Sequence, residues 1–281
     1  MTARFTRLFV PIALPALFAT GAEAQADHPP TDVILATTTS LQETGLLDTL
    51  TPLFHAATGF TLRPVAVGSG QALKMGERGD ADVVLAHAPE AEAAFMEAGH
   101  GVRRRVVAWN YFTIVGPADD PAGVRRTPTS ADALARIAAT GAVFVSRGDS
   151  SGTHQRELAL WRAAGGRPAW RKYLETGQGM STTLLVADER RGYALTDLAT
   201  YGSLRRRLDL VPLRGEEAAL RNVYHVIELN PAGHPRMNVD GGRAFADFVT
   251  SPAVQDLLAE FGRARTGAPL FVPARGVELA R

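Results

Sequence analysis

Short apolar segments alternate with longer amphipathic segments along the chain, and this alternation limits the fold more than any other feature of the sequence. Three of the apolar segments have the length and composition of β-strands: residues 33–36, 61–67 and 81–86. Between them, residues 46–57 repeat leucines at helical spacing, and residues 70–76 begin another helix. Strand–helix–strand order is typical of a parallel sheet with helices on both faces. The sequence therefore predicts an α/β fold.

Two longer strand-like segments suggest that the chain forms two lobes rather than one. Residues 106–115 (VVAWNYFTIV) and 223–229 (VYHVIEL) are each followed by a turn that contains proline. The segment between them repeats the alternation, with helices expected at residues 131–139 and 154–164 and strands at residues 142–145 and 193–195.

The helical tail at residues 242–261 then has only the first lobe to pack against. We therefore predict two lobes with parallel-rich sheets and flanking helices, whose cleft is a common type of ligand site. Lobe I is expected to be discontinuous, at residues 28–108 plus 228–281, with lobe II inserted at residues 109–227.

The N-terminus has the layout of a secretory signal peptide over residues 1–24. Arg4 and Arg7 precede an apolar run, and Ala22-Glu23-Ala24 provides a small-residue cleavage site. The apolar run is too short, and too interrupted by proline, to span the roughly 30 Å of a membrane core. Cleavage removes two arginines and one glutamate, which takes the net charge from +1 to zero. A chain without net charge has no strong attraction to nucleic acid, and a chain without cysteine has no disulfide framework.

Three predicted strand-to-helix junctions are rich in small hydroxyl residues. They are Thr37-Thr38-Thr39-Ser40, Gly68-Ser69-Gly70, and SRGDSSGT at residues 146–153. A helix N-terminus presents unpaired N–H groups and the positive end of the peptide dipoles, so it attracts anions. In a parallel sheet such junctions meet at the carboxyl ends of the strands. Simple helix capping is the alternative for each junction alone, and Ser40 with Glu43 reads as a capping box.

Arg147 is the one charged donor in these junctions, and a guanidinium can hold two oxygens of a tetrahedral anion at once. Asp149 is expected to pair with it. An aspartate in this position is also able to accept the proton of hydrogen phosphate, which leaves tungstate, molybdate, phosphate and sulfate open as ligands. A hydrolase is a second alternative, because Asp149, Ser150 or Ser151, and His154 are close in sequence. Residues so close around one helix start rarely meet as a triad.

These motifs resemble those of the tungstate-binding proteins of ABC transporters, within the type II periplasmic binding-protein fold that molybdate and phosphate binders share. The resemblance extends from about residue 32 to residue 262 and also includes Tyr193-Ala194-Leu195-Thr196-Asp197. It implies that lobe I supplies Thr39, Ser40 and Ser69, and that lobe II supplies an opposing wall of Arg147, Ser151, Gly152 and Thr153. Weaker candidates are Thr38, Thr182, Thr183 and Thr196.

The resemblance also implies what the protein does. It is expected to be a periplasmic monomer that captures tungstate, with molybdate as an alternative, and delivers the anion to an ABC transporter permease in the inner membrane. No enzymatic activity, no cofactor, no nucleic acid and no metal beyond that of the oxyanion itself are expected.

Overall fold

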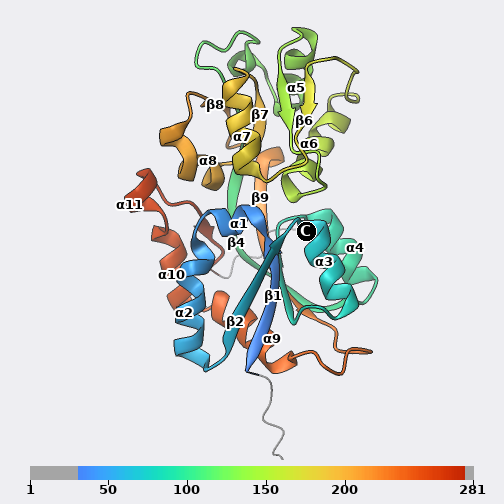
Figure 1. The fold of residues 1–281 in the computed structure, drawn as a ribbon, viewed down its shortest axis with the longest axis vertical. Helices are drawn as coiled ribbons and strands as arrows, with labels where there is room; N and C mark the ends of the chain where they lie inside the picture. The colour runs from blue at the N-terminus through green and yellow to red at the C-terminus, as the bar shows by residue number, and fades with distance from the viewer. Residues whose placement is uncertain (1–30, 276–281) are drawn as a thin grey trace, which may run out of the picture.

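The computed structural model describes residues 31–275, and these residues form two lobes that lie one above the other in Figure 1. The predicted signal peptide, residues 1–24, lies outside the described residues. Across residues 31–275, no helix has both the length and the apolar character needed to cross a membrane.

Lobe I, the lower lobe in Figure 1, is built on parallel strands, as the alternation of segments predicts. β1 pairs in parallel with β2 on one side and with β3 on the other. Thr38 is in register with Val67, so β1 and β2 end side by side at the edge of the sheet where α1 and α3 begin. The elements of this part are β1 (Asp32–Thr38), α1 (Thr39–Glu43), α2 (Leu46–Thr58), β2 (Thr61–Val67), α3 (Ser69–Arg78), β3 (Val83–Ala86) and α4 (Pro89–Glu97).

Two long strands, β4 (Gly101–Gly116) and β9 (Arg221–Leu229), run from one lobe into the other (Figure 1). β4 pairs with β9 up to Tyr111 and with β7 (Ala194–Asp197) from Phe112 onward. Each pairing made by β4 or β9 is antiparallel, so the sheets are mixed. The parallel ladders join β1 to β2 and β3 in lobe I, and β5 to β6 in lobe II. The lobe boundaries after residues 108 and 227 stay predictions, because both strands continue without a break through them.

Lobe II contains a smaller set of strands and its own helices. β5 pairs in parallel with β6, and a parallel bridge between Phe144 and Tyr193 connects β5 to β7. Its elements besides β7 are η1 (Val124–Arg126), α5 (Ser130–Ala139), β5 (Phe144–Ser146), α6 (Gly152–Ala163), β6 (Tyr173–Glu175), α7 (Met180–Glu189), α8 (Leu198–Leu204), η2 (Arg205–Arg207), β8 (Val211–Arg214) and η3 (Ala218–Leu220).

The C-terminal segment returns to lobe I, as predicted for the helical tail. Phe245 lies in the same buried cluster as Phe54, with ring centroids 5.5 Å apart in an edge-to-face arrangement. A separate buried cluster around Phe112, Leu134 and Trp161 forms a core of lobe II. The elements of the return are α9 (Val239–Val249), α10 (Pro252–Glu260), α11 (Arg263–Thr266) and β10 (Val272–Pro273), which pairs with β4.

Candidate functional site

The first junction leads from β1 into α1. Thr38 is the N-cap, because its backbone is extended and its hydroxyl accepts a hydrogen bond from the Leu41 amide at 3.3 Å. The capping box predicted from Ser40 and Glu43 is therefore wrong, since Ser40 lies inside the first turn of the helix. Thr39 is half-buried and Ser40 is buried at this turn.

The second junction leads from β2 into α3 and brings the backbone close to lobe II. Gly68 is the N-cap and makes no side-chain capping bond. A Cβ on Gly68 would lie 3.8 Å from Ser151 Cα, and one on Gly70 would lie 3.8 Å from the Ser150 carbonyl oxygen. Ser69, at the first position of the helix, is only 1% exposed. The N-terminus of α3 therefore faces the third junction directly.

The third junction, between β5 and α6, is a tight loop held by a buried carboxylate. The Ser146 hydroxyl donates to Glu157 Oε2 at 2.6 Å and accepts from the Gly148 amide at 3.2 Å. Gly148 has a φ of 64°, in the left-handed region that glycine tolerates. Ser150 has a φ of 59°, an uncommon conformation for a residue with a Cβ, of the kind that concentrates at functional sites.

Arg147 lies in this loop and is 4% exposed. Its Nη2 forms the predicted ion pair with Asp149. Asp149 Oδ1 also accepts from the Ser151 amide at 3.1 Å, and Ser151 in turn caps α6 by accepting from the His154 amide at 3.3 Å. Arg147 is thus held in place beside the start of α6, with its charge partly balanced by Asp149.

His87, which follows β3, connects the first junction to the third. Its Nε2 lies 3.1 Å from Ser40 Oγ, and a Cβ on Gly152 would lie 2.8 Å from its Cε1. The Asn222 amide nitrogen donates to Asn110 and to Tyr224, so Asn222 Oδ1 is left to accept from His87 Nδ1 at 2.8 Å.

Burial is the main influence on the charge of His87. It lowers the pKa of the imidazole, against opposing effects of Asp197, the bond to Asn222, and Glu92, while Arg147 lowers the pKa further. A neutral ring with its proton on Nδ1 presents a lone pair at Nε2, so the Ser40 hydroxyl donates to His87. No local pattern singles out His87, because its hydrogen-bond partners are 47 and 135 residues away along the chain.

Three buried donors at the second and third junctions have no hydrogen-bond partner within residues 31–275. They are Ser69 Oγ, Thr153 Oγ1 and Arg147 Nε. Buried polar atoms are almost always hydrogen-bonded in folded proteins, and an unpaired one costs about 1–3 kcal/mol. Three unpaired donors around helix N-termini form an arrangement suited to an anion with several oxygens.

Glu43 from α1 extends toward the N-terminus of α7 in lobe II. A Cβ on Gly179 would lie 3.1 Å from Glu43 Oε1, and Glu43 Oε2 is buried without a partner among the described residues. Burial raises the pKa of the Glu43 carboxyl, while hydrogen bonding with Ser181 and the charge of Arg147 oppose this effect. Sequence reasoning missed this residue as a contact between the lobes.

The weaker candidates Thr182, Thr183 and Thr196 are either exposed or already hydrogen-bonded within the protein. Thr182 is exposed on α7. Thr183 is buried, donates to the Gly179 carbonyl at 3.1 Å and lies 2.8 Å from the Thr176 hydroxyl. Thr196 is buried and donates to the Asp197 carbonyl at 3.2 Å.

The residues of the alternative hydrolase triad do not form one. His154 Nδ1 accepts from the Ser150 backbone amide at 3.0 Å, and Asp149 is bonded to Arg147 and to the Ser151 amide. Among the described hydrogen bonds and ion pairs of these residues, no carboxylate orients His154 toward a serine hydroxyl, as triad chemistry requires. Within the described part of the chain, no group of three or more His, Asp or Glu residues is arranged to hold a metal ion.

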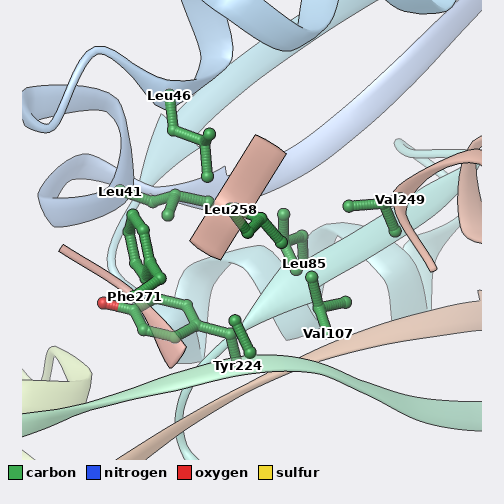
Figure 2. Close-up of a pocket in the computed structure, with 9 residues that line it drawn as sticks. Leu41, Leu46, Leu85, Val107, Tyr224, Val249, Leu258 and Phe271 are labelled. Carbon is green, nitrogen blue, oxygen red and sulfur yellow. The ribbon is translucent and has the colours of Figure 1, made fainter. Parts of the chain in front are cut away.

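A small cavity in lobe I, shown in Figure 2, is distinct from these junctions. It has a volume of about 10 Å³ and is lined by apolar side chains, among them Leu41, Leu85 and Phe271. A dry apolar space of this size is a packing gap in the core and offers nothing to an anion.

Comparisons with known proteins identify the family of the chain. The model of the PBP superfamily domain matches residues 23–253. The tungstate-binding protein TupA of Peptoclostridium acidaminophilum is 43% identical over 243 residues, which cover 86% of this chain and 85% of that protein.

Solved structures agree as well. The tungstate ABC transporter protein from Geobacter sulfurreducens is 43% identical, with a TM-score of 0.74, over 82% of this chain and 98% of that one. The tungstate-binding protein TupA from Desulfovibrio alaskensis G20 is 44% identical, with a TM-score of 0.73, over 87% of this chain and 98% of that one. The chain therefore belongs to the PBP superfamily and, within it, to the family of tungstate-binding proteins of ABC transporters.

Proposed function

We propose that the protein captures tungstate in the cleft between its lobes and delivers it to an ABC transporter. The observation that carries this proposal is the group of buried, unpaired donors on facing walls: Ser69 Oγ from lobe I, and Arg147 Nε and Thr153 Oγ1 from lobe II. A tetrahedral oxyanion offers oxygens in four directions, so one ion is able to accept from both lobes. It then stabilises the closed form by its contacts with both.

The proposed ligand shell extends beyond these three donors. The first turns of α3 and α6 contribute backbone amides at Ser69, Gly152 and Thr153, with Ser151 as the N-cap of α6. Thr39 and Ser40 contribute from α1, with Thr38 as its N-cap. Thr182, Thr183 and Thr196 remain weaker candidates, because two of them are already hydrogen-bonded to backbone carbonyls and the third is exposed.

The balance of charge favours an anion that carries no proton. Asp149 is engaged by Arg147 and by the Ser151 amide, which leaves it poorly placed to accept the proton of hydrogen phosphate. Tungstate, molybdate and sulfate are all unprotonated at neutral pH, so this argument sets aside only phosphate. Tungstate and molybdate remain the first and second candidates because the similar proteins are named for tungstate.

The proposed role also implies where the protein acts and what it contacts. The protein is proposed to be exported, to act in the periplasm as a monomer, and to contact the permease of its transporter in the inner membrane. It is proposed to be a carrier without enzymatic activity, since Asp149, Ser151 and His154 are committed to holding the loop and capping α6.

Calorimetric titration of the ligand-stripped mature protein tests the proposal. Tungstate, molybdate, sulfate and phosphate are added in separate titrations at the same pH and ionic strength. The expected result is one-to-one binding of tungstate that is far tighter than binding of sulfate or phosphate. Heat and thermal stabilisation from phosphate or sulfate alone would assign the cleft to that anion, and no response to any of the four would overturn the oxyanion role.

A further inference from the structure

We propose that His87 is a specificity-determining positioning residue whose ring sets the width of the oxyanion site. This inference rests on the proposed function, and it assigns to the site a preference for large tetrahedral anions. His87 belongs to lobe I, and its ring lies between Ser40 in the first turn of α1 and Gly152 in the first turn of α6. The two walls of the site are therefore separated by one side chain.

The contact with Gly152 limits how closely the lobes approach each other. A Cβ at Gly152 would lie 2.8 Å from His87 Cε1, 2.9 Å from Nδ1 and 2.9 Å from the His87 carbonyl oxygen. A methyl group at this position would therefore clash with the ring, which shows that the ring lies close against the start of α6. The absence of a side chain at residue 152 permits this approach, and the imidazole together with the His87 backbone carbonyl prevents a closer one.

The ring is held from the opposite side and acts as a rigid spacer. Asn222 accepts from Nδ1 at 2.8 Å, and the Tyr224 ring lies against the imidazole with centroids 4.9 Å apart. Asn222 donates in turn to Asn110 at 2.8 Å. Asn110 and Asn222 are register partners on β4 and β9, the strands that both lobes share. The position of the ring is thus fixed relative to the strands about which the lobes close.

A spacer of fixed width discriminates between anions by size. Tungstate and molybdate have nearly equal bond lengths, whereas the bonds of sulfate are shorter. Hydrogen bonds weaken as the donor–acceptor distance increases beyond about 3 Å. Sulfate oxygens therefore cannot reach the donors of both walls at once when His87 holds the walls apart. Removing the ring takes away one of the two groups of His87 that hold α6 away from α1 and leaves the backbone carbonyl in place. The part of the site beside Ser40 should then narrow, which improves the relative binding of the smaller anion.

Calorimetric titration of His87→Ala with tungstate, molybdate and sulfate tests this idea. The ratio of sulfate Kd to tungstate Kd is expected to fall about tenfold or more, a usual size of discrimination by steric fit. The ratio of molybdate Kd to tungstate Kd should stay the same, which separates a change in width from general loss of affinity. Tyr224→Phe is the matched control, because it alters the same network and leaves the ring and its contact with Gly152 in place; it should change neither ratio.

The outcomes distinguish the inference from the proposed function. If the wild-type protein binds no tungstate, the proposed function fails before His87 is tested. If the wild type binds tungstate and His87→Ala keeps the sulfate-to-tungstate ratio within about twofold, the spacer role is refuted and the proposed function stands.

Two further variants cover the case in which His87→Ala does not fold. His87→Gln keeps the length of the side chain and should retain most of the selectivity. Gly152→Ala places a methyl group against the ring and should hold the lobes apart, weakening tungstate binding about tenfold or more. Unchanged tungstate affinity in folded Gly152→Ala would also overturn the inference.

Discussion

The Ser146 hydroxyl donates a 2.6 Å hydrogen bond to Glu157 Oε2, and both residues are buried beneath the loop that carries Arg147. Glu157 Oε1 accepts two more bonds, from the Tyr173 hydroxyl at 2.7 Å and from Trp161 Nε1 at 3.1 Å. One carboxylate therefore connects the end of β5, the middle of α6 and β6. The loop that presents Arg147 to the cleft depends on this connection for its shape.

Replacing Glu157 by Ala should destabilise lobe II and weaken anion binding together. Two buried donors and one half-buried donor lose their acceptor, which should lower the free energy of unfolding by about 3 kcal/mol. Urea denaturation of the ligand-free protein measures the loss. Glu157→Gln, which keeps the shape and one acceptor oxygen, should lose less than Glu157→Ala. Equal stability of all three proteins would show that the carboxylate does not hold the loop.

Replacing Arg147 by Ala should weaken tungstate binding about 100-fold or more. The substitution removes a charge-assisted donor and leaves Asp149 as an uncompensated negative charge near the anion. Arg147→Lys keeps the charge but loses the planar guanidinium, so its tungstate affinity should lie between those of the wild type and Arg147→Ala. Arg191→Ala is the control, because Arg191 is exposed and its guanidinium forms an ion pair with Asp119, which is also exposed. Wild-type affinity in a folded Arg147→Ala protein would remove Arg147 from the site.

Replacing Ser69 by Ala, or Thr153 by Val, should weaken tungstate binding without lowering the stability of the ligand-free protein. Each change removes a buried hydroxyl without a partner, so the ligand-free protein should keep its free energy of unfolding or gain about 1 kcal/mol. Tungstate affinity should fall about tenfold, the effect of one lost hydrogen bond to a charged group. Denaturation and calorimetry on the same samples measure both quantities.

Thr113→Val is the matched control for these two variants. The Thr113 hydroxyl is equally buried but donates to the Arg214 carbonyl at 2.6 Å. This variant should lose about 1 kcal/mol of stability and keep its tungstate affinity. A loss of stability without a loss of affinity in Ser69→Ala would place that hydroxyl outside the site.

Glu43 should make the stability of the ligand-free protein depend on pH. Its pKa is raised in the folded state above the ordinary value of 4.5, chiefly by burial, so the folded protein binds the proton more tightly than the unfolded chain. The stabilisation that results is complete below pH 4.5 and is lost as the pH rises through the folded pKa. Wild type should therefore lose stability relative to Glu43→Gln between pH 4.5 and pH 7, as measured by thermal unfolding.

Ser181→Ala provides a second test of the environment of the Glu43 carboxyl. Hydrogen bonding with Ser181 lowers the pKa of Glu43, so its removal should raise that pKa further and widen the range of pH over which stability changes. A stability difference between wild type and Glu43→Gln that is the same at both pH values would show that the carboxyl is not buried between the lobes.

The local pattern of the sequence was enough to predict much of the architecture. β2 occupies residues 61–67 as predicted, and the three hydroxyl-rich junctions all lie at helix starts. The pairing of Arg147 with Asp149 was also predictable, because the two residues are only two positions apart. α4 and α7 were not predicted, since their apolar spacing is weak and short helices depend on tertiary packing.

What the sequence determined by itself is therefore the set of local structures: strands, helix starts, and the donors that stand at them. These features depend on hydrophobic periodicity, backbone propensity and capping, which act over a few residues. The tertiary structure decided which of these donors face one another. Ser40, His87 and Gly152 come together although they are far apart in the chain, and Glu43 reaches α7 in the other lobe. Such contacts arise only when β4 and β9 place the two lobes against each other. Patterns that act over a few residues do not specify how far apart the facing surfaces of the two lobes lie.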